Sequence, residues 1–498
     1  MANQSNILKD LARYLPEVVV PTVIAFISVP VYTRLFDPAA YGNFNIARVT
    51  NMLLERCCSW IGSSVTRYYH EYEKEQKLGL LITTLVKMLV VVSLITNVLV
   101  FALIHIIEMT DSLRLLLGIG IILFGVSLAS SCLRNILRMQ RRIIMHSIFV
   151  MVSSVFSFAI SLLLIMKYNL NIESIFIGNL VIAIILLPVL WRVSVLKLFQ
   201  LRQKIDARII KKFAAYGIPL TIGYLGGWAL DFSDRYIIKW LLDSHEVGVY
   251  SACYNVTWNA LYLIVNLFYM MEEPLAMKVY VAEGQDALRE FLNQETRLYL
   301  LIFMPFMFLM CCYSEQILSI MVSDKYHAGK GIIPYVAIST FFAGLIFKYR
   351  LGIMAMEKTR SLMVIIVSVG ILNVLLNFLL ISAHGLIGAA VATMSAYGVY
   401  FLLMFLVSRK IFTWRFPVRS LVKITLAAAT AIYPLSLSAV ANCGIYRLLL
   451  YGTASFGIYA TLLYILDEVK TVEIKALLQF VAAKLNMHRS KNVGMNVS

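Results

Sequence analysis

Long apolar stretches recur from one end of the chain to the other, separated by short polar segments. A run of about 20 mostly apolar residues is the length that a helix needs to cross a lipid bilayer. Fourteen such spans are predicted, covering residues 14–33, 43–65, 80–104, 113–133, 144–166, 172–191, 214–237, 249–271, 298–313, 332–352, 361–382, 385–408, 421–441 and 446–466. The pattern therefore predicts an all-α polytopic membrane protein, and the even number of spans places both ends of the chain on one side.

The composition agrees with this class. The 498 residues are 60% hydrophobic and 14% charged, and the mean hydropathy is +0.80. A soluble protein needs many more charges to cover its surface. No stretch is left over for a soluble domain.

Lysine and arginine indicate the orientation, because short loops rich in these residues stay in the cytoplasm. When most residues near the ends of the spans are counted with the adjoining loops, the side that carries the two termini has 33 of them, the other side has seven, and four lie within spans. Both termini are therefore predicted to be cytoplasmic. We interpret the net charge of +17 as a topology signal and as a contact for anionic lipid headgroups. Nucleic acid is not an expected partner, since the short loops offer no element that could read it.

Part of the sequence occurs twice. The pattern L-x-D-x4-G-x-aromatic follows the first span at residues 35–44 and the seventh span at residues 241–250, an offset of 206. Two shorter matches, at offsets of 217 and 210, follow in the same order. The pattern predicts two parallel six-helix lobes, related by a pseudo-two-fold axis along the membrane normal, with a cavity between them.

The expected domain organisation follows from this duplication. It consists of an N-terminal lobe (1–196), a basic cytoplasmic linker (197–212), a C-terminal lobe (213–410), and a final segment with two additional spans and a cytoplasmic tail (411–498).

The chain carries none of the enzyme signatures sought: a glycine-rich phosphate loop, histidines at metal-ligand spacing, or a Gly-x-Ser-x-Gly motif. We expect no metal and no cofactor. The longest predicted loop is also shorter than the external loop that membrane glycan polymerases and ligases usually carry, which argues against an enzyme of that kind.

Ionisable residues within the spans are the sharper signal, because a charge in lipid is costly unless it faces protein or water. The candidates for binding a substrate are the cationic residues Arg34, Arg48, Arg56, Lys87 and Arg235. The candidates for binding a coupling ion or forming ion pairs are the acidic residues Glu17, Glu55, Asp231 and Asp234. Two interpretations stay open: these groups fasten helices to each other, or they line a water-filled cavity.

Helical spacing groups several of them. Asp231, Asp234 and Arg235 share one helix face, and Arg48 and Glu55, seven residues apart, share another. Within its spans the first lobe has one more cation than anions. Guanidinium groups hold phosphate oxygens in pairs, so the first lobe is the expected position of an anionic headgroup such as a diphosphate.

Several segments resemble a known family. They are VPVYTRLFDPAAYGNFN after the first span, LRNILRMQRR after the fourth, DRYIIKWLLDSHEVGVYSACYN around the seventh, DKYHAGKGIIPYV before the tenth, and NVLLNFLLISAHGLIGAAVATMSAYG across the eleventh and twelfth. Together they resemble bacterial polysaccharide transporters of the O-antigen (Wzx) flippase type. The superfamily of these transporters also holds lipid II flippases and multidrug and toxin extrusion antiporters.

The resemblance implies a V-shaped, two-lobed transporter in the bacterial inner membrane. Such a protein moves an undecaprenyl-diphosphate-linked oligosaccharide from the cytoplasmic to the periplasmic leaflet by alternating access, with a cationic lumen that contacts the glycan. The implied partners are that glycan, membrane lipid, a proton or sodium ion for coupling, and the polysaccharide polymerase machinery. A cation-coupled multidrug or small-molecule antiporter of the same superfamily is the alternative, favoured by Asp231 and Asp234.

Overall fold

The computed structural model describes residues 2–199, 204–438 and 445–469, with side chains from Leu15 onward. The described chain is built of helices: α1 (Ala2–Leu35), α2 (Pro38–Cys57), α3 (Ser59–Lys74), α4 (Leu78–Ile106), α5 (Asp111–Met139), α6 (Ile143–Tyr168), α7 (Glu173–Ser194), α8 (Ala207–Leu241), α9 (Ser244–Cys312), α10 (Ser314–Met321), the 3-10 helix η1 (Asp324–Ile332), α11 (Ile333–Ala355), α12 (Thr359–Ile411), α13 (Val418–Ser438) and α14 (Ile445–Ile465). The predicted all-α fold class is confirmed.

The predicted spans correspond to these helices with three irregularities. The second span is divided into α2 and α3 by a turn at Cys58. The helix α9 combines the eighth and ninth spans around Gly284, and α12 combines the eleventh and twelfth around Gly385. Both glycines have a positive φ, 87° and 58°, a conformation that glycine adopts at little cost.

Ten helices in the described part of the chain are long and apolar enough to cross a membrane. Most residues of the segments between predicted spans at 134–142 and 272–297 are helical, so the helices there continue beyond the predicted span ends. Their polar residues are largely Glu, Gln, Arg and Lys, which favour helix outside the bilayer almost as much as alanine does.

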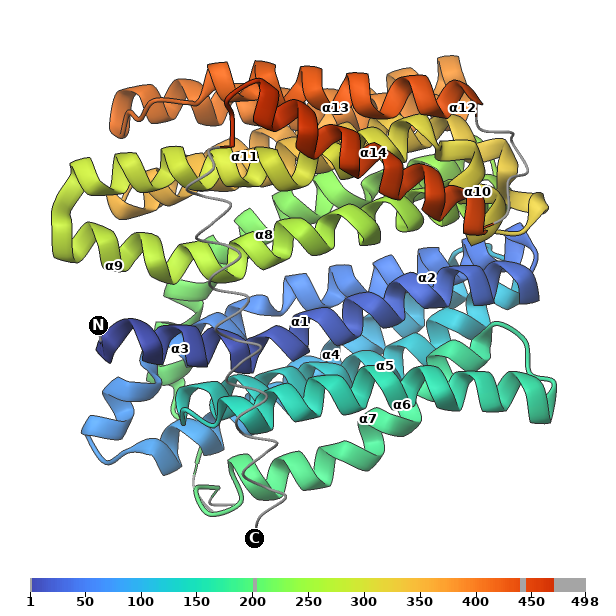
Figure 1. The fold of residues 1–498 in the computed structure, drawn as a ribbon. Coiled ribbons are helices and arrows are strands. Elements are labelled where there is room, and N and C mark those ends of the chain that lie inside the picture. The colour runs from blue at the N-terminus through green and yellow to red at the C-terminus, as the bar shows by residue number, and fades with distance from the viewer. Residues whose placement is uncertain (1, 200–203, 439–444, 470–498) are drawn as a thin grey trace, which may run out of the picture.

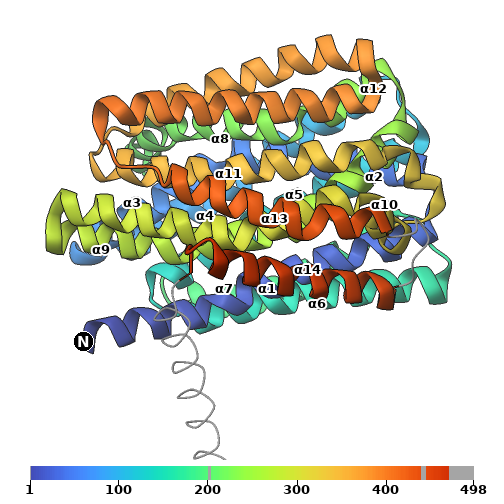
Figure 2. The same ribbon diagram turned by 45° about the horizontal axis from the view of Figure 1, so that its top comes forward.

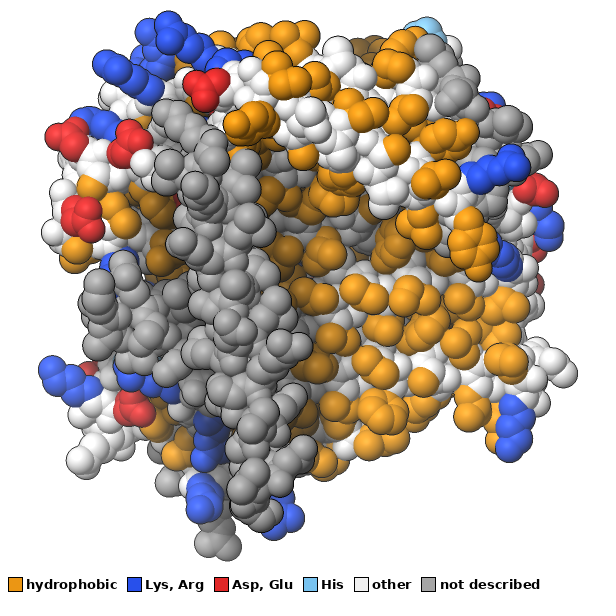
Figure 3. Space-filling view, viewed as in Figure 1, with side chains coloured by type: hydrophobic (Ala, Val, Ile, Leu, Met, Phe, Trp, Pro, Cys, Tyr) orange, Lys and Arg blue, Asp and Glu red, His pale blue; other side chains and the backbone are white. Residues whose placement is uncertain are grey.

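The helices form two lobes, α1–α7 and α8–α14, which lie one above the other in Figure 1. In the second lobe, α13 packs on α9, and α14 packs on both; the turned view shows them on the outside of the lobe (Figure 2). On the face seen in Figure 3, hydrophobic side chains cover the middle of the molecule and charged side chains gather at its two ends. This distribution is the one that a bilayer requires of a protein that spans it.

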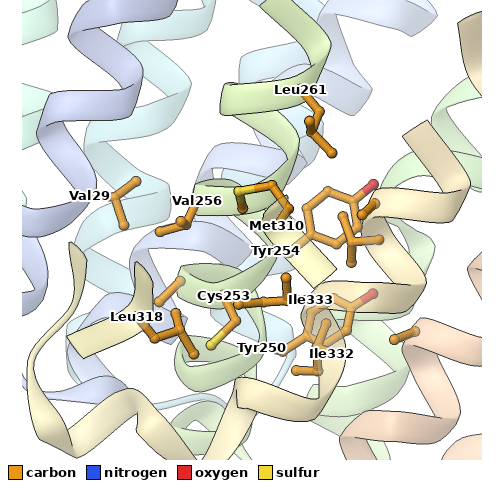
Figure 4. Close-up of a cluster of buried hydrophobic side chains, with 14 of the residues drawn as sticks. Val29, Tyr250, Cys253, Tyr254, Val256, Leu261, Met310, Leu318, Ile332 and Ile333 are labelled. Atoms are coloured by element: carbon orange, nitrogen blue, oxygen red, sulfur yellow. The ribbon is translucent and has the colours of Figure 1, made fainter. Parts of the chain in front are cut away.

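The two lobes share one hydrophobic core. It joins Val29 of α1 and Tyr41 of α2 to Tyr250 and Val256 of α9, and Figure 4 shows part of it around α9. The duplicated turns 35–44 and 241–250 belong to this region, which we call the turn end.

At the turn end the duplicated sequence makes a reciprocal contact. A Cβ atom on Gly42 would lie 1.8 Å from the carbonyl oxygen of Ser244, and one on Gly248 would lie 1.8 Å from that of Pro38. Pro38 and Ser244 are themselves equivalent by the offset of 206. The turn of each lobe therefore packs its backbone directly against the glycine of the other lobe. Only glycine permits this close approach.

Polar contacts also join the lobes. Near the turn end, Ser244 Oγ donates to Asn43 Oδ1 at 2.7 Å. At the opposite end, Lys212 Nζ of α8 lies 2.5 Å from Glu71 Oε1 of α3, and this hydrogen bond raises the pKa of Lys212. The lobes are thus in contact at both ends in this conformation.

Candidate functional site

Charged side chains from both lobes approach one another where α2 faces the second lobe. Because α2 packs against both α8 and α9, its arginines at positions 48 and 56 lie at the lobe interface, whereas Glu55 interacts electrostatically with Arg134 of α5 in the first lobe. We use the name interlobe charge cluster for Arg48, Arg56, Asp231 and Arg350. The first two belong to α2, and the others to α8 and α11.

Arg48 interacts electrostatically with Arg235, and Arg56 links α2 to the members of the cluster that belong to the second lobe. The Arg56 guanidinium carbon lies 6.0 Å from the ring centre of Tyr224 on α8, and Arg56 interacts electrostatically with Asp231. Arg56, Arg350 and Asp231 all act electrostatically on Tyr262 of α9. Groups that are more than 100 residues apart in sequence therefore share one region of the interface.

The arginines of the cluster lack acidic partners at contact distance. Within the described residues, neither Arg48 nor Arg56 has a carboxylate within 4.0 Å. Arg48 is half-buried, and its Nε has no hydrogen-bond partner, whereas Arg56 and Glu55 are exposed. A buried nitrogen without a hydrogen-bond partner is costly, so an anion that accepted a hydrogen bond from Arg48 Nε would be bound favourably.

Asp231 is the acid that stays accessible. It is half-buried, and its Oδ1 accepts a hydrogen bond from the Tyr397 hydroxyl at 2.6 Å. Its backbone carbonyl accepts from Arg235 Nη1 at 2.6 Å. The Asp231 side chain is therefore oriented by α12 and retains accessible surface.

Asp234 and Arg235 lie next to this site but have a different environment. Both are 0% exposed and form an ion pair, Arg235 Nη1 to Asp234 Oδ1, at 2.7 Å. The Tyr250 hydroxyl donates to Asp234 Oδ2 at 2.6 Å, and the Arg235 guanidinium lies 4.4 Å from the Tyr254 ring centre. In this conformation the pair fastens α8 to α9 and borders no accessible space, as the helix-fastening interpretation predicts.

The remaining predicted residues are not brought into the cluster. Glu17 on α1 accepts hydrogen bonds from His146 Nδ1 and Ser147 Oγ on α6, both at 2.8 Å. Arg34 donates to the Ile320 carbonyl of α10 at 2.7 Å, which ties the lobes near the turn end. Lys87 lies half-buried on α4, in the core of the first lobe.

Three charged residues with a place in the second lobe were missed. Lys348 and Arg350, near the end of the predicted tenth span, were counted with the cytoplasmic loop that follows it, and Glu272 lay just outside the eighth span. Lys348 and Glu272 form an ion pair with both side chains 1% exposed, whereas Arg350 is exposed. Because α9 and α11 run through these positions, the helical register could have placed Lys348 and Glu272 on facing helix surfaces.

No metal site is indicated by the residues present: across 2–199, 204–438 and 445–469, no group of three or more His, Cys, Asp or Glu side chains could hold an ion. The interlobe charge cluster is suited instead to holding an organic or phosphate anion between guanidinium groups.

Known proteins with this architecture are membrane transporters. A family model described as polysaccharide biosynthesis protein matches residues 10–270, and a model named MatE matches residues 219–379. The chain is similar to the solved structure of the lipid II flippase MurJ in an inward closed conformation, with 15% identity and a TM-score of 0.76, covering 92% of this chain and 98% of that one. It is also similar to an inward-facing multidrug resistance MATE family transporter, with 10% identity and a TM-score of 0.63, covering 80% and 98%.

Among curated proteins, an uncharacterized membrane protein of Methanocaldococcus jannaschii is 22% identical over 296 residues, which is 57% of each chain. The match thus spans little more than half the length of that relative. The family model covers more than half of this chain, and the structural similarity covers nearly all of it. The chain therefore belongs to the polysaccharide biosynthesis protein family, within the superfamily of multidrug, oligosaccharidyl-lipid and polysaccharide exporters.

Proposed function

We propose that this protein is a flippase that moves a lipid-linked oligosaccharide with a diphosphate headgroup across the bacterial inner membrane. The substrate class is an undecaprenyl-diphosphate-linked repeat unit of O-antigen or a related surface polysaccharide. Transfer runs from the cytoplasmic to the periplasmic leaflet, by alternating contact of the lobes at their two ends. Both termini lie in the cytoplasm in this proposal.

The observation that carries the proposal is the pair Arg48 and Arg56. Both guanidinium groups lie at the lobe interface within the span of α2, and neither has a carboxylate partner among the described residues. A diphosphate supplies several oxygens that two guanidinium groups can hold in pairs. Arg350, from the second lobe, adds a third cation on the opposite side of the interface.

The reciprocal contact at the turn end supports the mechanism. The lobes meet there over glycines, small polar side chains and a shared hydrophobic core, a closely packed surface that can separate as two rigid bodies. At the opposite end, the Lys212 and Glu71 side chains of the ion pair are 38% and 44% exposed, while Ser64 of α3 donates to the buried Phe213 carbonyl of α8. Alternating access requires both sets of contacts to separate in turn, and the exposed ion pair adds little to the free-energy cost at the second end.

The test is export of the surface polysaccharide in cells that lack the native protein and receive variants. A charge-assisted hydrogen bond contributes about 1.5–3 kcal/mol, so Arg48→Ala and Arg56→Ala each reduce export by about 10- to 150-fold. Arg48→Lys and Arg56→Lys keep the charge and retain more activity. Arg67→Ala, an exposed arginine on the neighbouring α3, leaves export unchanged at equal protein level.

Either of two results would refute the proposal. Normal export by all four variants would remove Arg48 and Arg56 from the transport path. Normal display of the lipid-linked unit at the periplasmic face in cells without the protein would exclude the flippase activity.

A cation-coupled antiporter is the second candidate, and the accessible carboxylate of Asp231 favours it. In vesicles, Asp231→Asn abolishes gradient-driven uptake if this carboxylate carries the coupling ion. The flippase proposal stands if uptake of cationic drugs is absent from the wild type as well.

A further inference from the structure

A cavity of about 310 Å3, lined by seven polar and eight apolar residues, lies inside the first lobe, apart from the interlobe charge cluster. Its walls come from α1, α5, α6 and α7, and none of its lining residues belongs to the second lobe. The polar groups in its lining are Arg134, Ser127, Ser130, Ser153, Ser154, Ser157 and Asn179. Its lining contains no carboxylate.

Most of these hydroxyl groups have no partner within the protein. Ser154 donates to its own helix, at the Val150 and Met151 carbonyls. The hydroxyls of the other four serines make no hydrogen bond with a described residue. Of these, Ser130 and Ser157 are each only 7% exposed, and their hydroxyl oxygens keep a small accessible surface beside the cavity that they line. Polar groups in such a confined position are usually hydrogen-bonded, which points to a hydrogen-bonding occupant.

Arg134 gives the cavity its charge. No carboxylate lies within 4.0 Å of it among the described residues. The acid that acts on it electrostatically is Glu55 of α2, which lies outside the lining. The cavity therefore offers one cation, several hydroxyls and the amide of Asn179 to a ligand.

This set of groups matches an acidic sugar better than other small ligands. A sugar acid carries one carboxylate and several hydroxyls, in the same proportion as one guanidinium to several hydroxyl and amide groups. A cavity of about 300 Å3 is at the lower end of the range for ligand sites, and a bare phosphate would fill only part of it. An acyl chain would leave the hydroxyls and Arg134 without partners, at a cost.

We propose that this cavity is a second ligand site, which binds a carboxylate-bearing sugar unit with Arg134 on the carboxylate and the serine hydroxyls on the sugar. The sugar comes either from the glycan of the transported lipid or from a free sugar acid. The first source rests on the proposed flippase function, whereas the binding itself does not.

Direct binding to the purified full-length protein in detergent tests the site, with glucuronate, glucose and inorganic phosphate as probes in titration calorimetry. The background is Arg48→Ala with Arg56→Ala, which removes anion binding at the interlobe charge cluster. Glucuronate binds in this background at least tenfold more tightly than glucose or phosphate. Arg134→Gln weakens glucuronate binding at least tenfold, Arg134→Lys weakens it less, and Ser130→Ala with Ser157→Ala weakens it severalfold.

Two matched controls separate the site from general effects. Arg138→Gln removes a cation one turn further along α5 that is not in the lining, and Ser161→Ala removes a hydroxyl one turn from Ser157 that is not in the lining and donates to the Ser157 carbonyl. Both keep glucuronate affinity. Thermal unfolding verifies that each variant is folded.

Two outcomes of the binding experiment would overturn the proposal, and an export assay distinguishes the two sources of the sugar. Equal affinity for phosphate and glucuronate would show an anion site without sugar recognition. Glucuronate binding that disappears in the Arg48→Ala and Arg56→Ala background would place it at the interlobe charge cluster. If the sugar comes from the transported glycan, Arg134→Gln reduces the export of an acidic glycan in cells and leaves the export of a neutral glycan unchanged. If the wild-type protein binds glucuronate but Arg134→Gln reduces the export of neither glycan, the ligand of the site is a free sugar acid. That result would leave the proposed flippase function unaffected.

Discussion

The reciprocal contact at the turn end can be broken by adding one methyl group. In Gly42→Ala, the new Cβ would lie 1.8 Å from the Ser244 carbonyl oxygen and 3.0 Å from the Gly248 nitrogen. Both neighbours are backbone atoms, so no side chain can rotate away. The lobes must move apart locally, which also strains the hydrogen bond from Ser244 to Asn43.

The free-energy cost of the added methyl group can be bounded. Overpacking a close-packed contact costs about 1–3 kcal/mol. If the cost applies only to the conformation in which the turns touch, the equilibrium shifts toward separated lobes by about 5- to 150-fold. Gly248→Ala, with its Cβ 1.8 Å from the Pro38 oxygen, has the same effect by symmetry.

The assay is a spin-label distance measurement between the two turns. Labels at Ala39→Cys and His245→Cys, two exposed positions related by the offset of 206, are introduced into a chain without its native cysteines. Gly42→Ala adds a longer-distance population to the short distance of the parent. Gly118→Ala, where the added Cβ meets nothing within 4 Å, leaves the distribution unchanged. Identical distributions for Gly42→Ala and the parent would refute the reasoning.

Further predictions concern the buried charges, with thermal unfolding in detergent as the measurement. Asp234→Asn leaves a buried guanidinium unpaired and costs about 3–5 kcal/mol, whereas Asp231→Asn, at a half-buried position, costs much less; equal losses would contradict the difference in burial. Lys348→Met alone destabilises by a similar amount, and adding Glu272→Leu restores most of the stability, because replacing both members of a buried pair is often neutral; no recovery in the double variant would argue against the pair. Glu17→Ala removes the acceptor of the buried His146 donor and costs about 1–3 kcal/mol, while Glu17→Gln keeps an acceptor and costs less; equal losses in the two variants would contradict this role of the Glu17 oxygen.

The difference in burial between Asp231 and Asp234 is a property that the sequence did not predict. Spacing placed both on one face of α8, correctly, since three residues amount to nearly one helical turn. Yet Asp234 is fully buried against α9, and Asp231 retains accessible surface beside α12. The difference depends on how α8 is rotated between its neighbours, which no local pattern encodes.

The sequence by itself determined the membrane class, the all-α fold, the approximate positions of the spans and the duplication into two lobes. It could do so because hydrophobic length and repeated turns are local properties, imposed by the bilayer and by backbone geometry. Only the tertiary structure decided which charges pair and which stay available. It buried Arg235 in an ion pair, left Arg48 without one, placed Arg350 in the interlobe charge cluster, and placed Arg134, just beyond the predicted fourth span, in the lining of a cavity. Those outcomes arise from contacts between helices far apart in the chain, where packing sets the rotation of each helix and the partner of each side chain.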